Sequence, residues 1–123
     1  MTPFGAKVRA LRIERGETLK AMAAALDVSA AYLSALEPGK RGLPTWYMVQ
    51  RIIAHFNVIW DDAEELQRLA EISDPRITID TAGLDPAATE LANLLGAKIG
   101  GLSRKSLDEL LLKLRSVAAR DGV

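Results

Sequence analysis

The length of 123 residues suits one domain, or one domain with an appended segment, and the 49% apolar content is enough for a buried core. The formal net charge is zero and charged residues make up 26%, which is ordinary for a globular chain and argues against a generic, strongly basic nucleic-acid binder. The absence of cysteine excludes disulfides and thiolate chemistry. The single histidine, His55, leaves too few ligands for a zinc site and no basis for a histidine triad.

Apolar residues recur at helical spacing almost throughout the chain, which predicts an all-α fold. Thr2, Ser29 and Thr45 are the predicted N-caps of the first, third and fourth helices, and the second helix is expected to start at Thr18. Gly16 and Pro38 are expected to end the first and third helices, and Asp27 suits a tight turn because Asp tolerates the left-handed conformation. The second and third helices, with the small residues Ala23 and Ala24 at their crossing, therefore predict a helix-turn-helix.

The fourth and fifth predicted helices bring both tryptophans and the histidine. Trp46 opens a broad apolar face on the fourth helix, and Trp46 and Trp60 are expected in the core or at its edge. A contact between the indole N–H of Trp46 and a DNA phosphate is the alternative. His55, near a helix end, is expected to be a helix-terminal charge or a plain surface residue. The acidic run 61–65 suits the positive end of the fifth helix.

The chain after the fifth helix changes character. The stretch SDPRITIDTAGLDP has two prolines and a glycine, so we interpret residues 71–85 as a linker. Ile77 and Ile79 alternate with polar residues, which leaves open a short strand that pairs with a partner strand.

Two leucine-rich helices are predicted in residues 86–123. Gly96 is expected to interrupt the first of them, and Ser106 and Glu109, at capping-box spacing, are expected to open the second. The apolar side chains of these helices exceed what one hairpin can bury by itself. They include Leu91, Leu94, Leu95, Ile99, Leu107, Leu110, Leu111 and Leu114. We therefore expect a helical hairpin that forms a homodimer.

The run GETLKAMAAALDVSAAYLSALEPGKRGLPT, from Gly16 to Thr45, resembles the XRE family of lambda-repressor-like DNA-binding domains. The matching features are G-x-T-L-x-x-[MA]-A, then V-S-x-x-Y-L-S-x-L-E, then G-K-R-G. The resemblance covers about residues 4–70 and implies a five-helix bundle whose third helix enters the major groove of DNA while the second spans the backbone.

The resemblance also implies roles for individual residues. The positions facing base edges are Ser29, Ala30, Ala31, Ser34 and Ala35. The positions near phosphates are Thr18, Lys20, Tyr32, Lys40 and Arg41. Arg12 and Glu37 match an ion pair that braces the bundle. Pro38 departs from the family pattern, because a proline has no N–H to donate to a phosphate.

A base-facing surface of alanines can still discriminate between sequences. Phosphate contacts position a protein on DNA, while base contacts specify the site. Alanine methyl groups pack on thymine methyls, and Ser34 can donate or accept a hydrogen bond. We therefore expect a half-site that contains A·T pairs, with DNA shape and dimerisation supplying further specificity.

The charge distribution and these motifs lead to one prediction of function. Residues 1–57 hold eight basic and four acidic side chains, whereas residues 58–123 hold eight and twelve, so only the first half is suited to a polyanion. We predict a DNA-binding domain (1–70), a linker (71–85) and a helical dimerisation segment (86–123). The whole is a homodimeric transcriptional regulator at a (pseudo)palindromic operator.

The sequence also leaves one rival function open and argues against several others. The rival function is a protein-interaction module, such as a toxin-neutralising antitoxin with autoregulatory DNA binding. An enzyme is not expected, since nucleophile–base candidates and a glycine-rich phosphate loop are missing. No cofactor, metal or small-molecule effector is expected. The lack of a long apolar run and of a signal-peptide core predicts a cytoplasmic protein with no membrane partner.

Overall fold

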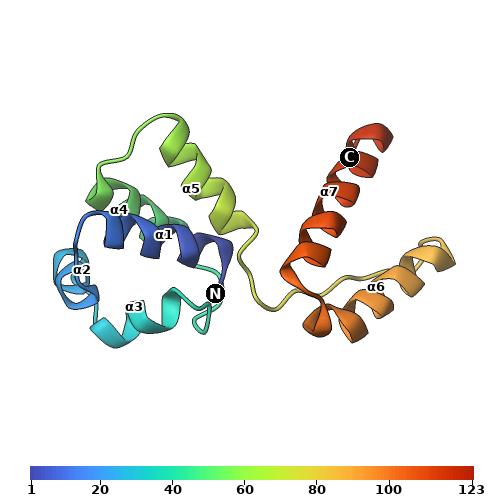
Figure 1. Ribbon diagram of the computed structural model, residues 1–123, viewed down its shortest axis with the longest axis horizontal. Helices are drawn as coiled ribbons and strands as arrows, with labels where there is room; N and C mark the ends of the chain where they lie inside the picture. The colour runs from blue at the N-terminus through green and yellow to red at the C-terminus, as the bar shows by residue number, and fades with distance from the viewer. The chain divides into compact units, whose positions relative to one another are not determined.

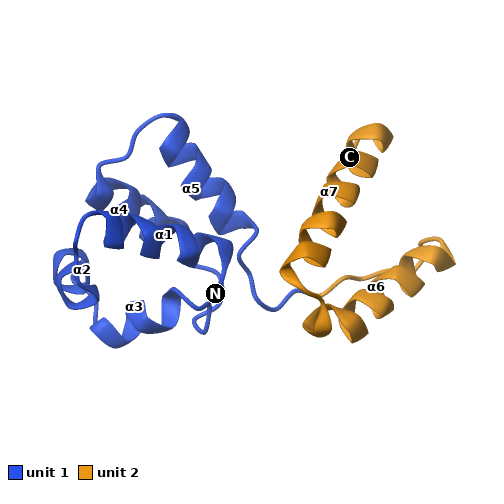
Figure 2. Cartoon of the chain, viewed as in Figure 1, with its two compact units in different colours: residues 1–77 blue, residues 78–123 orange.

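The computed structural model describes residues 1–123, which divide into two compact units, residues 1–77 and 78–123 (Figure 2). The first unit contains α1 (Pro3–Glu14), α2 (Leu19–Leu26), α3 (Ala30–Leu36), α4 (Trp46–Phe56) and α5 (Asp61–Glu71). The second contains α6 (Pro86–Lys98), the 3₁₀ helix η1 (Ile99–Gly101) and α7 (Arg104–Asp121) (Figure 1). The all-α class is confirmed, and Ile77 and Ile79 form no strand within the chain.

The predicted starts of α1 to α4 are confirmed by the hydrogen bonds at their N-termini. Each capping side-chain oxygen accepts a hydrogen bond, at 3.0–3.1 Å, from the backbone N–H three residues further on. These caps are Thr2, Thr18, Ser29 and Thr45. Asp27 has φ 57° and ψ 45°, the left-handed conformation that lets α2 and α3 follow each other within three residues.

The first unit closes around a single apolar core to which all five helices contribute. The contacts run between α1 and α5, α2 and α3, α2 and α4, and α4 and α5. The thirteen buried apolar residues are Phe4, Val8, Met22, Ala23, Leu26, Leu33, Leu36, Met48, Val49, Ile52, Phe56, Leu66 and Ala70. Ala23 is buried as expected at the α2–α3 crossing, whereas Ala24 is exposed.

The end of the first unit is tied to its beginning by Ser73, which is buried. The Ser73 hydroxyl accepts the backbone N–H of Phe4 at 2.9 Å and donates to the carbonyl of Leu69. The first compact unit therefore includes the residues that follow α5, as far as Ile77.

No single helix is long and apolar enough to cross a membrane. Only α2 and α3 taken together reach that length and composition, across a bend of 109°. Both helices supply buried residues to the core of the first unit.

The prediction that both tryptophans lie in the core or at its edge is wrong. Trp46 is 75% exposed and Trp60 is 81% exposed. Trp46 is the first residue of α4 and borders an open hollow with the buried residues Val49 and Ala70, so its ring lies over the core but mostly in solvent. Trp60 precedes α5 with φ 53° and ψ −125°, and its side chain makes no capping hydrogen bond to that helix.

The second unit begins its helices with side-chain caps, though not all at the predicted positions. Asp85 caps α6 by accepting the N–H of Ala87 at 2.8 Å. α7 begins at Arg104 and is capped by Ser103, whose hydroxyl accepts the N–H of Ser106 at 3.1 Å. The predicted start at Ser106 and Glu109 is wrong, because Ser103 provides the same cap three residues earlier.

The helices of the second unit are continuous but bury nothing. α6 runs through Gly96 to Lys98, so the predicted interruption at Gly96 is also wrong. No residue of α6, η1 or α7 is buried. The two long helices diverge from η1 (Figure 1). Most of their leucines are exposed.

Candidate nucleic-acid interface

The helix α3 has one buried face and one open face. Leu33 and Leu36 are 1% and 2% exposed and anchor the helix in the core. On the other side, Ala30, Ala31 and Ser34 are exposed. Ser29 is also exposed and Ala35 is half-buried, so the five predicted base-facing residues form a shallow, small-residue surface at the side of α3 away from the core.

Three exposed cations lie on the elements before and after α3. Lys20 lies in the first turn of α2, and Lys40 and Arg41 follow α3. The guanidinium carbon of Arg41 lies 5.6 Å from the centre of the Tyr32 ring, a cation–π contact that holds the arginine beside α3. Tyr32 thus positions the Arg41 side chain, and its own hydroxyl is a further hydrogen-bonding group for a phosphate.

The loop after α3 is held against the bundle. The N–H of Lys40 donates to the carbonyl of Ala35 at 2.8 Å, and the N–H of Gly39 donates to Leu36 at 3.1 Å. Gly39 has φ 90°, and a Cβ there would lie 2.4 Å from Cγ2 of Thr2. Glycine tolerates both this φ and the close approach to Thr2, and it therefore fixes the turn that carries Lys40.

An ion pair connects the C-terminal end of α3 to α1. Nε of Arg12 lies 3.2 Å from a carboxylate oxygen of Glu37, and Nη2 of Arg12 donates to the second oxygen at 3.3 Å. The two side chains are 14% and 8% exposed. This two-point contact between partly buried charges fixes the orientation of the guanidinium and, through Glu37, the end of α3.

The same arginine extends the connection to α2 and α4. Nη1 of Arg12 donates to the carbonyl of Glu17 at 3.3 Å, and the Glu17 carboxylate lies 2.7 Å from Nε2 of His55. His55 lies in the last turn of α4, as one of the two expectations had it, and it is a half-buried partner of Glu17 and not a plain surface residue. These four side chains link the ends of α3, α1 and α4 to the residue that precedes the α2 cap.

Gly5 makes the closest approach between α1 and α3. A Cβ built on Gly5 would lie 1.8 Å from the carbonyl oxygen of Glu37, closer than any real contact. Gly5 and Arg12 are two helical turns apart, so both lie on the side of α1 that faces Glu37. The backbone of Glu37 is thus held by Gly5 and its side chain by Arg12.

The structure brings some of the predicted site residues together and leaves others separate. Arg12 contacts Glu37, and Tyr32 contacts Arg41. Thr18 and Ser29 use their oxygens as helix caps, and their hydroxyl hydrogens are free to donate to a phosphate. Sequence reasoning missed Gly5, Glu17 and His55. The only signal for Gly5 was a glycine inside a helical pattern, and nothing in the sequence pairs Glu17 with a histidine 38 residues away.

The chemistry available at this surface is recognition of a polyanion. No group of three or more His, Asp or Glu side chains is arranged to hold a metal ion. A five-helix bundle in which two short helices cross at 109°, the second with an open small-residue face, belongs to the helix-turn-helix class.

Comparison with known protein families agrees with that class. The family model described as "Helix-turn-helix domain" matches residues 3–69, more than half of the chain, and this protein belongs to that family. The match confirms the predicted helix-turn-helix identity of the first unit. The chain is a DNA-binding helix-turn-helix regulator, a class that is not typically enzymatic.

Comparisons with individual proteins add little to the family match. Among solved structures, a chain of the SinR protein/SinI protein complex is 20% identical, with a TM-score of 0.44 over 94% of this chain and 98% of that chain. No curated protein matches the sequence.

Proposed function

We propose that this protein is a sequence-specific transcriptional regulator that binds double-stranded DNA as a homodimer at a (pseudo)palindromic operator. The observation that carries the proposal is the open face of α3, made of small side chains, together with the exposed Lys20, Lys40 and Arg41. Short side chains allow the helix backbone to approach the floor of the major groove. The cations then contact phosphates on both sides.

Base recognition in this proposal depends on methyl groups and one hydroxyl. Ala30 and Ala31 pack on thymine methyls, and Ser34 exchanges hydrogen bonds with a base edge. Because these contacts are few, each position discriminates modestly, and the preferred half-site contains A·T pairs. Ala30→Gly together with Ser34→Ala should change the preferred sequence more than the overall affinity.

Dimerisation in this proposal belongs to residues 86–123. Folding this segment alone buries no residue. Seven of its large apolar side chains are about half exposed or more, namely Leu91, Leu94, Ile99, Leu110, Leu111, Leu112 and Leu114. A second copy covers this surface, and the resulting pair places two α3 helices at half-sites about 10 base pairs apart, centre to centre.

Selection of bound sequences from random duplex DNA tests the function directly. The proposal predicts a palindromic consensus and an affinity that falls steeply with salt, with a log–log slope of about −0.9 for each phosphate contact. Absence of enrichment over random sequence would contradict DNA recognition and favour the protein-interaction module.

The cations have a matched control. Lys40→Ala should reduce the magnitude of the salt slope by about 1 and weaken binding to all duplexes alike. Lys105→Ala removes an equal charge from α7 in the second unit and should leave the slope unchanged. Equal effects of the two changes would show that net charge, not position, governs binding.

A further inference from the structure

The segment Arg76–Thr81 has the composition of a strand but no strand partner. Its sequence, RITIDT, alternates isoleucine with polar residues, and four of its six residues are β-branched. Ile77 is 71% exposed and Ile79 is 55% exposed. The backbone amides from Ile77 to Thr81 have no hydrogen-bond partner within the chain, so they are available to pair with a second strand.

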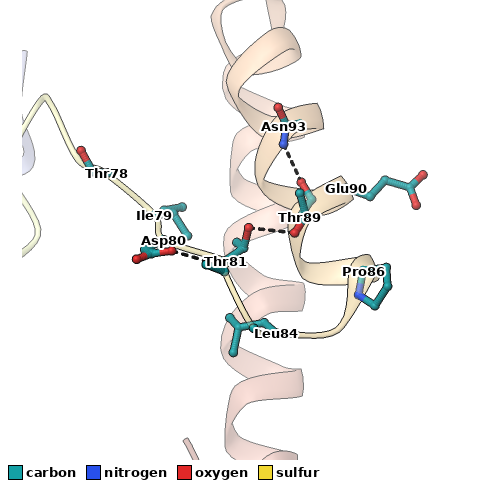
Figure 3. Close-up of a pocket in the computed structure, with 11 residues that line it drawn as sticks. Thr78, Ile79, Asp80, Thr81, Leu84, Pro86, Thr89, Glu90 and Asn93 are labelled. Atoms are coloured by element: carbon teal, nitrogen blue, oxygen red, sulfur yellow. Dashed lines mark hydrogen bonds between the residues drawn. The ribbon is translucent and has the colours of Figure 1, made fainter.

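The end of this segment is anchored to the second unit. The hydroxyls of Thr81 and Thr89 lie 2.8 Å apart, which joins the segment to the second turn of α6 (Figure 3). The Asp80 carboxylate accepts the N–H of Ala82 at 2.9 Å and begins the turn toward α6. Residues 78–81 thus border an open hollow whose far side is the first turns of α6 (Figure 3).

One antiparallel register of two such segments pairs both the isoleucines and the oppositely charged residues. With a two-fold axis at Thr78, each Ile77 lies opposite the Ile79 of the second copy. The same register places each Arg76 opposite the Asp80 of the second copy, an ion pair on the opposite face. With the axis at Ile79, Ile77 would face Thr81 and Arg76 would lose its acidic partner. The isoleucine pattern and the charges therefore favour the same register.

We propose that residues 76–80 of two copies of this chain pair as a two-stranded antiparallel ribbon centred on Thr78. This inference rests on the proposed homodimer and adds to it a specific contact between the two copies of the segment that joins the two units along the chain. The four isoleucines gather on one face of the ribbon, and two Arg76–Asp80 ion pairs form on the other. The ribbon gives partners to amides that are otherwise unpaired.

The absence of cysteine makes single-cysteine variants a clean test of the register. In the proposed ribbon the two Thr78 Cα atoms lie about 4.5–5.5 Å apart, within disulfide range. Thr78→Cys should therefore form a covalent dimer on mild oxidation. Thr81→Cys, the same exchange three residues later, is the control, because its two copies are about 20 Å apart at 3.4 Å per residue.

Charge exchange provides a second, independent test. Asp80→Arg places Arg76 opposite an arginine, and Arg76→Asp places Asp80 opposite an aspartate, so each variant alone should dimerise more weakly. A mixture of the two variants restores both ion pairs and should form heterodimers in preference to either homodimer, by roughly two- to thirtyfold at low salt.

The outcomes separate this inference from the proposed function. Cross-linking of Thr78→Cys well above Thr81→Cys, with heterodimer preference, supports the ribbon. A chain that sediments as a dimer but shows equal cross-linking of the two variants overturns the ribbon and leaves the homodimer in place. A chain that sediments as a monomer at micromolar concentration overturns both.

Discussion

The two units of this protein handle their apolar residues in opposite ways. The first unit buries thirteen apolar side chains from five helices. The second unit, built from equally well-capped helices, buries none and exposes a row of leucines. Capping and helical periodicity favour a helix, but most of its stability in a protein comes from burial of its apolar face. The first unit provides that burial itself, whereas in the second unit it belongs to the proposed homodimer.

The largest expected effect distinguishes two helical glycines, one in each unit. Gly5→Ala places a methyl group 1.8 Å from the Glu37 carbonyl, so α1 and α3 must separate. We expect a loss of about 3 kcal/mol or more in the free energy of unfolding of the first unit. Gly96→Ala, on α6 with nothing within 4 Å, should instead stabilise by about 0.5–1 kcal/mol. Denaturant unfolding of both variants measures these free energies. A Gly5→Ala variant of unchanged stability would contradict the close approach of Gly5 to the Glu37 carbonyl.

The next effect concerns the ion pair that holds the end of α3. Arg12→Met leaves the Glu37 carboxylate nearly buried and without its partner, which should cost about 3 kcal/mol. The double change Arg12→Met with Glu37→Leu should recover much of that loss, because no charge is then stranded. Thermal unfolding of the single and double variants measures both the loss and the recovery. Equal losses would mean that the pair does not brace the bundle.

An exposed leucine of the second unit should affect association and not folding. Leu114→Glu adds a charge to the leucine surface of α7 and should raise the dimer dissociation constant by about a hundredfold or more, since a charge in an apolar interface is left unpaired. The unfolding transition of the first unit should not move. Sedimentation equilibrium measures the first quantity and near-ultraviolet circular dichroism the second. A loss of first-unit structure would refute the independence of the two units.

The smallest expected effect has the opposite sign to most mutations. Trp60 is the most exposed tryptophan and its φ of 53° is unfavourable for any residue with a Cβ. Trp60→Gly should be neutral or stabilise by up to about 1 kcal/mol. A clear loss of stability in denaturant unfolding would show that Trp60 packs more closely than its exposure indicates.

The local features of the fold could be predicted from the sequence, because a cap or a turn needs only adjacent residues. Thr18, Ser29 and Thr45 cap their helices, and Asp27 turns, through contacts within three residues. Where two equivalent caps compete, as with Ser103 and Ser106, spacing alone did not choose between them.

Contacts between residues that are far apart in the sequence could not be predicted in this way. The pairing of Glu17 with His55 depends on how the start of α2 meets α4, which no local sequence pattern indicates. The exposure of Trp46 and Trp60 depends on where the core ends, and hydrophobicity does not report that boundary. The Arg12–Glu37 pair was expected only because the motif resembled a known family.

The central claim is that the open face of α3 enters the major groove, and a single charge placed on that face tests it. Ala31→Glu sets a carboxylate on the exposed side of α3, where it meets phosphates and base edges but no core residue. Ala10→Glu, on the exposed side of α1, is the matched control. Affinity for the selected duplex should fall at least a hundredfold for Ala31→Glu and little for Ala10→Glu, with both proteins folded. Undiminished binding by a folded Ala31→Glu variant would contradict it.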